Sequence, residues 1–152
     1  MPTKEIFHLN SDELTPFEER ICHILSNCDD IDDSVSHYRN LQKKSKEIRN
    51  NDNLQYLNRM FSVLSNPDRM MIIEALSLKD MCSCEFEALL QKSQPAVSRD
   101  LKKLEKAQLI QGWKKGNFIH YSLIKSTFDR FREIFINWID NFQNWFGQQP
   151  KN

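Results

Sequence analysis

The sequence predicts a mainly α-helical protein with one small β-hairpin wing, and two observations predict it. Apolar residues recur at spacings of three and four along most of the 152 residues, which is the period of a helix. Between residues 109 and 123 the pattern changes to two short strand-like runs around Lys114-Lys115-Gly116-Asn117, which indicates a hairpin. Only three glycines are present, and no glycine-rich phosphate-binding motif occurs.

Two helices are expected in the N-terminal third of the chain. Thr15 and Glu18 have the spacing of a capping box, with proline at the first helical position, so a helix is expected to begin there. The acidic run 29–33 is expected to interrupt it. A second helix is expected over 34–48, and because it carries few apolar residues we expect it to be exposed or to contact a partner.

The helical signal is stronger after residue 54. Pro67 is expected to open a helix, because a missing N–H costs least in the first turn. A short helix is expected after Cys82-Ser83-Cys84, and Ser93 is expected to cap a further helix over 94–106. Three side chains of that helix are expected to face the core: Val97, Leu101 and Leu104.

An aromatic seam marks the last helix, which is expected to open at Ser126. The aromatic side chains recur at spacings of three and four over more than two heptads: Phe128, Phe131, Phe135, Trp138, Phe142 and Trp145. The alternative is an ordinary core-facing stripe. Since so apolar a terminal helix has few partners in a small domain, we expect a dimer interface.

Charge is unevenly distributed along a chain of zero net charge. Residues 1–36 contain nine acidic and two basic side chains, whereas residues 91–120 contain seven basic and two acidic ones. A local basic patch favours nucleic-acid binding, although a solvated charged face is the alternative. We expect a cytoplasmic, nucleoid-associated protein, because neither a membrane-length apolar run nor a secretory signal is found, and its four cysteines therefore point to metal or redox chemistry.

The expected order of helix, short helix, turn, recognition helix and basic hairpin is that of a winged helix-turn-helix. The residues resemble the ArsR/SmtB family of metal-sensing transcriptional repressors. Four segments carry the resemblance: Phe61–Arg69, Cys82–Glu85, Ser93–Leu104 and Gly116–Leu123. It covers residues 55–124, the expected DNA-binding domain. Residues 1–54 are then expected to form an N-terminal helical dimerisation and sensor segment, and residues 125–152 a C-terminal dimerisation helix.

The resemblance implies a homodimer that represses transcription from a palindromic double-stranded operator and leaves the DNA when an inducer binds. In the family, the N- and C-terminal helices form the dimer. The sequence departs from the family at two positions. Asp100 stands where recognition helices often have histidine, so it is expected to point away from DNA or to alter sequence choice. Gln108 stands where glycine is common after that helix.

DNA contacts are expected from the recognition helix and the wing. Short polar side chains and arginine at the start of the helix are suited to reading base edges, whereas lysines bind phosphates and set affinity. Val97 is expected in the core instead. The expected DNA-contacting residues are Ser93, Gln94, Ala96, Ser98, Arg99, Lys102, Lys103, Lys114 and Lys115.

Cys82 and Cys84 are the first candidates for a metal site. Two positions apart on a helix they would diverge, but at a helix start they can converge. The resemblance implies that they bind a thiophilic ion: cadmium, lead, zinc or trivalent arsenic. Arsenic sensors of the family often add a third cysteine where this chain has Glu87. No organic cofactor is expected.

Cys22 and Cys28 are the other candidate ligands, since some members of the family complete the site with cysteines from the partner's N-terminal segment. A spacing of six prevents one regular helix from presenting both to one ion. Either the helix ends before Cys28, or only one of them ligates. The alternative for Cys28 is a core position on the apolar stripe of that helix, whereas Cys22 lies off the stripe.

Two further functions compete with metal sensing. The thiols could form a redox or sulfide switch, with Cys22 or Cys28 in a disulfide with Cys82 or Cys84. The chain could also be a winged-helix interaction module with a structural zinc, although its basic region argues against that. No Ser/His/Asp, Cys/His or paired-carboxylate arrangement stands out, so an enzyme is not expected.

Overall fold

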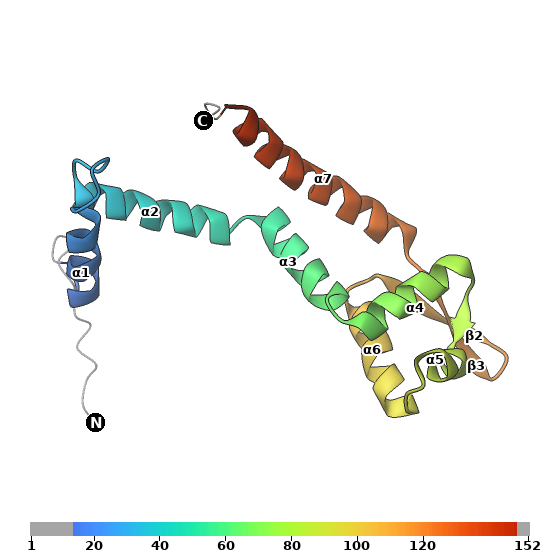
Figure 1. Cartoon of the computed structure of the whole chain (residues 1–152). Coiled ribbons are helices and arrows are strands. Elements are labelled where there is room, and N and C mark those ends of the chain that lie inside the picture. Colours follow the sequence, from blue (N-terminus) through green and yellow to red (C-terminus); the bar gives the residue numbers. More distant parts are fainter. Residues whose placement is uncertain (1–13, 149–152) are drawn as a thin grey trace, which may run out of the picture. The chain divides into compact units, whose positions relative to one another are not determined.

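The computed structural model describes residues 14–148, and it divides into one unit that ends at Asn50 and a second that starts at Asn51. The described chain is mainly helical with a small sheet, as predicted (Figure 1). No helix in the described residues is long and apolar enough to cross a membrane. The elements are α1 Pro16–Leu25, α2 Ser34–Arg49, α3 Asp52–Leu64, α4 Pro67–Leu78, β1 Met81–Cys82, α5 Ser83–Leu90, α6 Gln94–Lys106, β2 Ile110–Lys115, β3 Phe118–Leu123 and α7 Lys125–Gln148.

The first unit is a hairpin of α1 and α2. The predicted capping box is confirmed: the Thr15 N–H donates to Glu18 Oε2 at 2.7 Å, and the Glu18 N–H donates to Thr15 Oγ1 at 3.3 Å. The Tyr38 hydroxyl of α2 donates to the other oxygen of the Glu18 carboxylate at 3.4 Å. Among residues 14–50, Cys22 and Tyr38 are the two whose largely apolar side chains are buried.

The second unit has its core where α3, α4, α5 and α6 meet the sheet. The predicted inward face of α6 is confirmed, because its three apolar side chains are at most 1% exposed. Each such side chain contributes roughly 1.5–3 kcal/mol through burial. The buried cluster comprises Tyr56, Met60, Ile72, Leu76, Phe86, Val97, Leu101, Leu104, Leu109 and Ile110.

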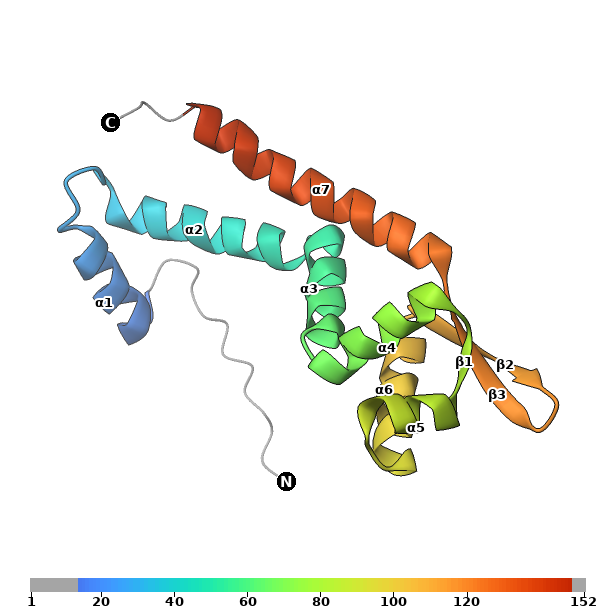
Figure 2. The same cartoon turned by 45° about the vertical axis from the view of Figure 1, so that its right-hand side comes forward.

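The sheet has three antiparallel strands in the order β1-β3-β2 (Figure 2). The predicted hairpin is confirmed, and Lys115 pairs with Phe118 across a tight turn in which Gly116 has a φ of 61°. The two-residue strand β1 was not predicted. It places Cys82 opposite His120 of β3, so the first cysteine of the CxC segment is part of the wing's ladder.

Gln108 follows the end of α6, the expected recognition helix, and has a left-handed conformation with a φ of 58°. Its N–H donates to the Glu105 carbonyl at 2.8 Å, and the Leu109 N–H donates to the Leu104 carbonyl at 3.0 Å. These two bonds form a Schellman motif. Gln108 therefore adopts the same backbone turn that glycine would favour at this position. The turn has a steric cost, because a side chain is unfavourable in the left-handed conformation.

The aromatic seam of α7 is divided between the core and the surface. Phe128 and Phe131 are partly buried against the core cluster. Phe61 of α3 makes edge contacts with Phe131 and Phe135, at centroid distances of 5.9 and 5.7 Å. Phe142, further along the helix, is 44% exposed. The Trp145 side chain lies outside the described part of the structure.

Candidate DNA interface and cysteine site

A concave surface lies between the outer face of α6 and the wing. We call it the wing cavity; its volume is about 660 Å³. It brings together four of the expected DNA-contacting side chains: Gln94, Ser98, Lys102 and Lys114. Its other lining residues are Ser83, Leu101, Glu105, Gly112, Trp113, Asn117, Phe118, Ile119 and Tyr121. A recognition helix and a wing thus share one concave face, which is the geometry of a reader of duplex DNA.

The other expected DNA contacts lie outside this cavity. Ser93 and Arg99 are exposed, Ala96 is half-buried, and Lys115 lies at the exposed wing tip. Lys103 is exposed as well, but it lines a different cavity, on the side of α6 that faces α3. The sequence prediction placed Lys102 and Lys103 together as phosphate contacts, and the structure separates them, because neighbouring residues on a helix point about 100° apart.

Asp100 points inward from α6. The buried Arg69 of α4 donates from Nη1 to Asp100 Oδ1 at 3.2 Å. The same guanidinium donates to the carbonyls of Val63 and Ser62 at 2.5 and 3.3 Å. Asp100 therefore points away from the wing cavity, in agreement with the first of the two outcomes expected for it. Through Arg69 it connects α6 to the end of α3.

A second ion pair holds the turn that precedes the recognition helix. Lys92, in that turn, forms an ion pair with Asp68, the residue before Arg69. Two consecutive residues of α4 thus form ion pairs: Asp68 with a lysine just before α6, and Arg69 with an aspartate on α6. We call these two ion pairs the α4 clasp.

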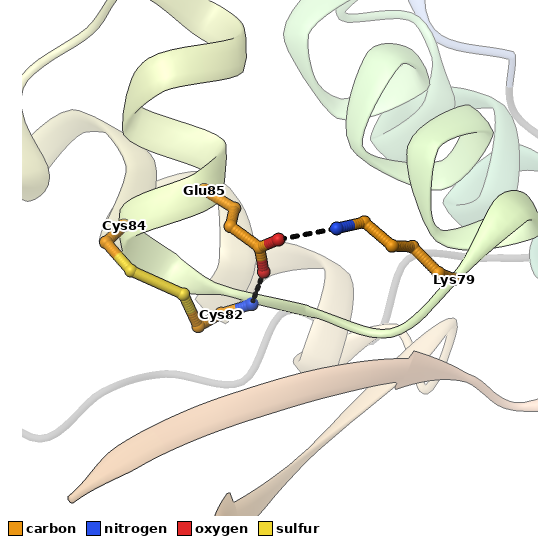
Figure 3. The surroundings of a disulfide bond; sticks show 4 residues. All are labelled: Lys79, Cys82, Cys84 and Glu85. Atoms are coloured by element: carbon orange, nitrogen blue, oxygen red, sulfur yellow. Dashed lines mark hydrogen bonds and ion pairs between the residues drawn. A yellow bond between two sulfur atoms is a disulfide. The ribbon is translucent and has the colours of Figure 1, made fainter.

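The CxC segment lies where β1 passes into α5. Cys82 is buried, Cys84 is exposed, their Cα atoms are 5.5 Å apart, and their sulfurs form a disulfide (Figure 3). The expected convergence at a helix start is therefore confirmed. The pairing differs from the cross-pairing of N-terminal with CxC cysteines that the redox alternative assumed, because an extended residue followed by a helical one directs both side chains to one side.

Glu85 anchors this junction. Its carboxylate accepts a hydrogen bond from the Cys82 N–H and another from Lys79 Nζ, each at 2.7 Å (Figure 3). The hydrogen bond from Lys79, followed by that from the Cys82 backbone, holds the pKa of Glu85 below its ordinary value. The ionised carboxylate therefore fixes the backbone of the first cysteine, while the Cys84 side chain is left accessible.

The N-terminal cysteines are placed differently from each other. Helix α1 ends at Leu25, so Cys28 lies in the following turn and is exposed, whereas Cys22 is only 5% exposed. The expectation that Cys28 could be a core residue on the apolar stripe of α1 is wrong, because the helix stops before the stripe reaches it. Cys22, expected off the stripe, is the cysteine that packs inside the hairpin.

The described residues contain no group of three or more His, Cys, Asp or Glu side chains that could hold a metal ion. The two CxC sulfurs are soft donors suited to cadmium, lead, zinc or trivalent arsenic, but two donors leave a tetrahedral or trigonal site incomplete. The chemistry of the pair fits such ions, and the number of donors requires at least one further ligand.

Comparison with known proteins identifies the family of this chain. The family model described as bacterial regulatory protein, arsR family, matches residues 66–111. The transcriptional repressor SdpR of Bacillus subtilis is 33% identical over 88 residues, which cover 58% of this chain and 93% of that protein. The chain belongs to the ArsR family. It is therefore a member of a family of DNA-binding transcriptional regulators and not an enzyme, as the sequence predicted.

Other relatives agree with this ArsR-family membership. The transcriptional repressor SmtB homolog of Synechocystis is 27% identical over 104 residues, covering 68% of this chain and 79% of that protein. The arsenical resistance operon repressor of Staphylococcus aureus is 32% identical over 73 residues, covering 48% and 70% respectively. The solved ArsR-like transcriptional regulator from Rhodococcus shares the fold, with a TM-score of 0.56 and 19% identity over 61% of this chain and 88% of that chain.

Sequence reasoning missed the α4 clasp. Arg69 was part of a motif that carried the family resemblance, but its side chain was given no role. A signal was available: an acid on the inner side of a recognition helix needs a cation, and Arg69 lies in a helix expected to pack nearby. The contribution of Ser83 to the wing cavity was missed too, because nothing in the sequence indicates which side of the CxC segment faces the wing.

Proposed function

We propose that this ArsR-family chain is a cytoplasmic repressor that binds operator DNA through the wing cavity and the exposed start of α6. Support comes from the four polar or basic side chains gathered there and from the excess of basic residues between 91 and 120. Gln94, Ser98 and Arg99 would read base edges, and Lys102, Lys114 and Lys115 would bind phosphates. Ser93, the N-cap of α6, and Ala96, in its first turn, would lie against the DNA backbone.

The proposed signal is a thiophilic ion bound by Cys82 and Cys84. The single observation that carries this proposal is the convergence of the two cysteines at the β1–α5 junction, with Ser83 between them in the lining of the wing cavity. The ion would be cadmium, lead, zinc or trivalent arsenic, and the relative named for arsenical resistance supports this class. Cys28, being exposed, is better suited than Cys22 to complete the site.

The test is operator binding by fluorescence anisotropy under reducing conditions, with Cd(II), Zn(II) or As(III) added. We expect metal to weaken binding in the wild-type protein. Cys82→Ser should bind the operator normally and no longer respond to metal. Release of the wild-type protein only by an oxidant would reject metal sensing, and loss of DNA binding in Cys82→Ser would show that the cysteine is structural.

A dithiol switch is the second candidate function, and the Cys82–Cys84 disulfide favours it. Two thiols would be oxidised to one disulfide, and their two protons and two electrons would reduce hydrogen peroxide to two waters. Peroxide should then weaken operator binding, dithiothreitol should restore it, and Cys28→Ser should behave as wild type. A response that requires Cys28 would instead support a disulfide between the two cysteine pairs.

The proposed partner of the chain is a second copy of itself, joined in part through α7. Phe142 and Ile136 are each more than 40% exposed on that helix, and apolar side chains exposed in this way are typical of an interface. Sedimentation should show a dimer for the wild-type protein and a smaller species for Phe142→Glu. An unchanged dimer in that variant would place the interface elsewhere. Family membership favours this DNA-binding homodimer over an interaction module with structural zinc.

A further inference from the structure

A second cavity lies on the side of α6 away from the wing. We call it the cationic cavity; its volume is about 520 Å³. It is formed by α3, the end of α6, the turn after it and α7, all within the second unit. Its lining residues are Tyr56, Asn58, Arg59, Met60, Ser62, Val63, Lys103, Lys106, Ala107, Gln108 and Arg130. This volume lies within the range of cavities that hold small organic molecules.

The charge of the lining is of one sign. It contains Arg59, Lys103, Lys106 and Arg130 and no carboxylate. None of these four cations forms an ion pair within the part of the chain that the structure describes. Like charges gathered in a concavity repel one another, and walls of low dielectric strengthen their field toward an anion. The wing cavity differs, since Glu105 lies among its cations.

The floor of the cationic cavity is apolar and aromatic. Tyr56 and Met60 are buried core residues whose side chains also line the cavity. The Arg130 guanidinium lies 4.6 Å from the centre of the Tyr56 ring, and the Tyr56 hydroxyl donates to the Thr127 carbonyl at 3.4 Å. Arg130 is thus held against the Tyr56 ring, and this stacking leaves its N–H groups available to an anion.

From these observations we propose that the cationic cavity binds a small organic anion that has one phosphate, sulfonate or carboxylate group and an apolar or ring-shaped part. The anionic group would accept hydrogen bonds from Arg59, Lys106 and Arg130, and the apolar part would cover Met60 and Tyr56. Because α3, the end of α6 and α7 all line this cavity, the ligand would join α6 to the packed helices α3 and α7. The proposal does not depend on the cysteines or on a metal.

The experiment is isothermal titration of the full-length reduced protein with phenyl phosphate as the probe. Phenol and inorganic phosphate are the comparison ligands, since each carries one half of the expected chemistry. We expect phenyl phosphate to bind with one site per chain, more tightly than either comparison ligand, and to bind more weakly at high salt, because screening reduces attraction between exposed charges. Absence of phenyl phosphate binding at low salt would overturn the proposal.

Two matched variants locate the site. Arg59→Gln with Lys106→Gln removes two cations of the cavity, and binding is expected to weaken by at least about tenfold, because charge-assisted hydrogen bonds are lost. Lys114→Gln with Lys115→Gln removes two cations of the wing, and binding should change by less than about twofold. Equal weakening in both variants would show a general charge effect and reject the site. If the first double variant unfolds, Lys106→Gln alone gives the same comparison.

A final measurement separates a free anion from DNA phosphate as the occupant. Phenyl phosphate is titrated into the protein saturated with a duplex that contains its operator. Persistence of binding supports a pocket for a small molecule. Loss of binding, together with a reduced salt dependence of DNA affinity in the Arg59→Gln and Lys106→Gln variant, would show that the cavity is part of the DNA-binding surface and would overturn the proposal.

Discussion

Cys82 and Cys84 lie at a junction fixed on both sides, whereas Cys22 and Cys28 lie on either side of a helix end. The first pair is held by the β1–β3 ladder and by the Glu85 carboxylate, and both sulfurs are directed to the same place. In the second pair, one side chain is buried in the α1–α2 hairpin and the other is exposed in the turn after α1.

The difference shows what brings two thiols together along a chain. A strand residue followed by helical residues directs side chains two positions apart to one side, so convergence costs no rearrangement. Cys22 and Cys28 are six residues apart on either side of a helix end, so their side chains are not aligned in this way. The buried Cys22 thiol is already used in packing. Once its disulfide is reduced, the first pair can therefore serve a ligand without rearrangement of the backbone, whereas Cys22 of the second pair would first have to leave its packing.

The largest expected effect separates the two pairs by metal affinity. Structural zinc in small thiolate sites binds with about 10–16 kcal/mol, so one of four thiolates is worth about 3 kcal/mol, or roughly a hundredfold. Cys84→Ser should lose about that much Cd(II) affinity in a competition titration. Cys28→Ser should lose less, about tenfold, because the ordering of an exposed turn offsets part of the gain. Equal losses would contradict the comparison.

The next effect tests how much the α4 clasp stabilises the second unit, which contains Cys82 and Cys84. Asp100→Ala leaves the buried Arg69 without its carboxylate, but two backbone carbonyls still accept from the guanidinium, so the expected cost is about 1–3 kcal/mol. Urea unfolding followed by tryptophan fluorescence measures this loss. Asp100→Asn, which still accepts a hydrogen bond, should cost less. A neutral Asp100→Ala would show that the clasp does not hold α6.

A smaller effect on stability distinguishes Cys22 from Cys28. Cys22→Ala should destabilise the α1–α2 hairpin by about 1 kcal/mol, because a buried sulfur is removed beside Tyr38. Cys28→Ala should lie within about 0.5 kcal/mol of wild type, as is usual for exposed positions. Hydrogen exchange of the α1 and α2 amides reports the difference. Equal protection in both variants would mean that Cys22 contributes no packing.

The smallest effect concerns the anchor of the first pair. The pKa of Glu85 lies below its ordinary value of 4.5, so its ionised form stabilises the folded state above about that pH, and this contribution is lost as the pH falls through the lowered pKa. The stability difference between wild type and Glu85→Gln should accordingly be present at pH 7 and vanish in acid. A difference that is independent of pH would show that the carboxylate charge has no part in holding Cys82.

The sequence predicted the helices around the recognition helix, the hairpin and the convergence of the CxC pair, because periodicity, capping residues and proline are local signals. It did not predict β1, since two residues carry no periodicity. The alternative of a core position for Cys28 was wrong, because the end of α1 depends on the turn after Leu25 and not on the apolar stripe. The roles of Asp100 and Lys103 depend on which side of α6 faces which helix, and only the assembled structure determines that.

The pairing of Cys82 with His120 has a mechanical consequence for the wing. Strands β2 and β3 each have six residues and are about 20 Å long at roughly 3.3 Å per residue. His120, the partner of Cys82, lies two residues from Phe118 at the tip of the hairpin and three residues from Leu123 at its base. Only about 7 Å of strand therefore separates the paired position from the tip, which carries Lys115. The CxC segment thus braces the outer half of the wing, and a displacement of Cys82 along the β1–β3 ladder is passed to the wing tip over a very short span.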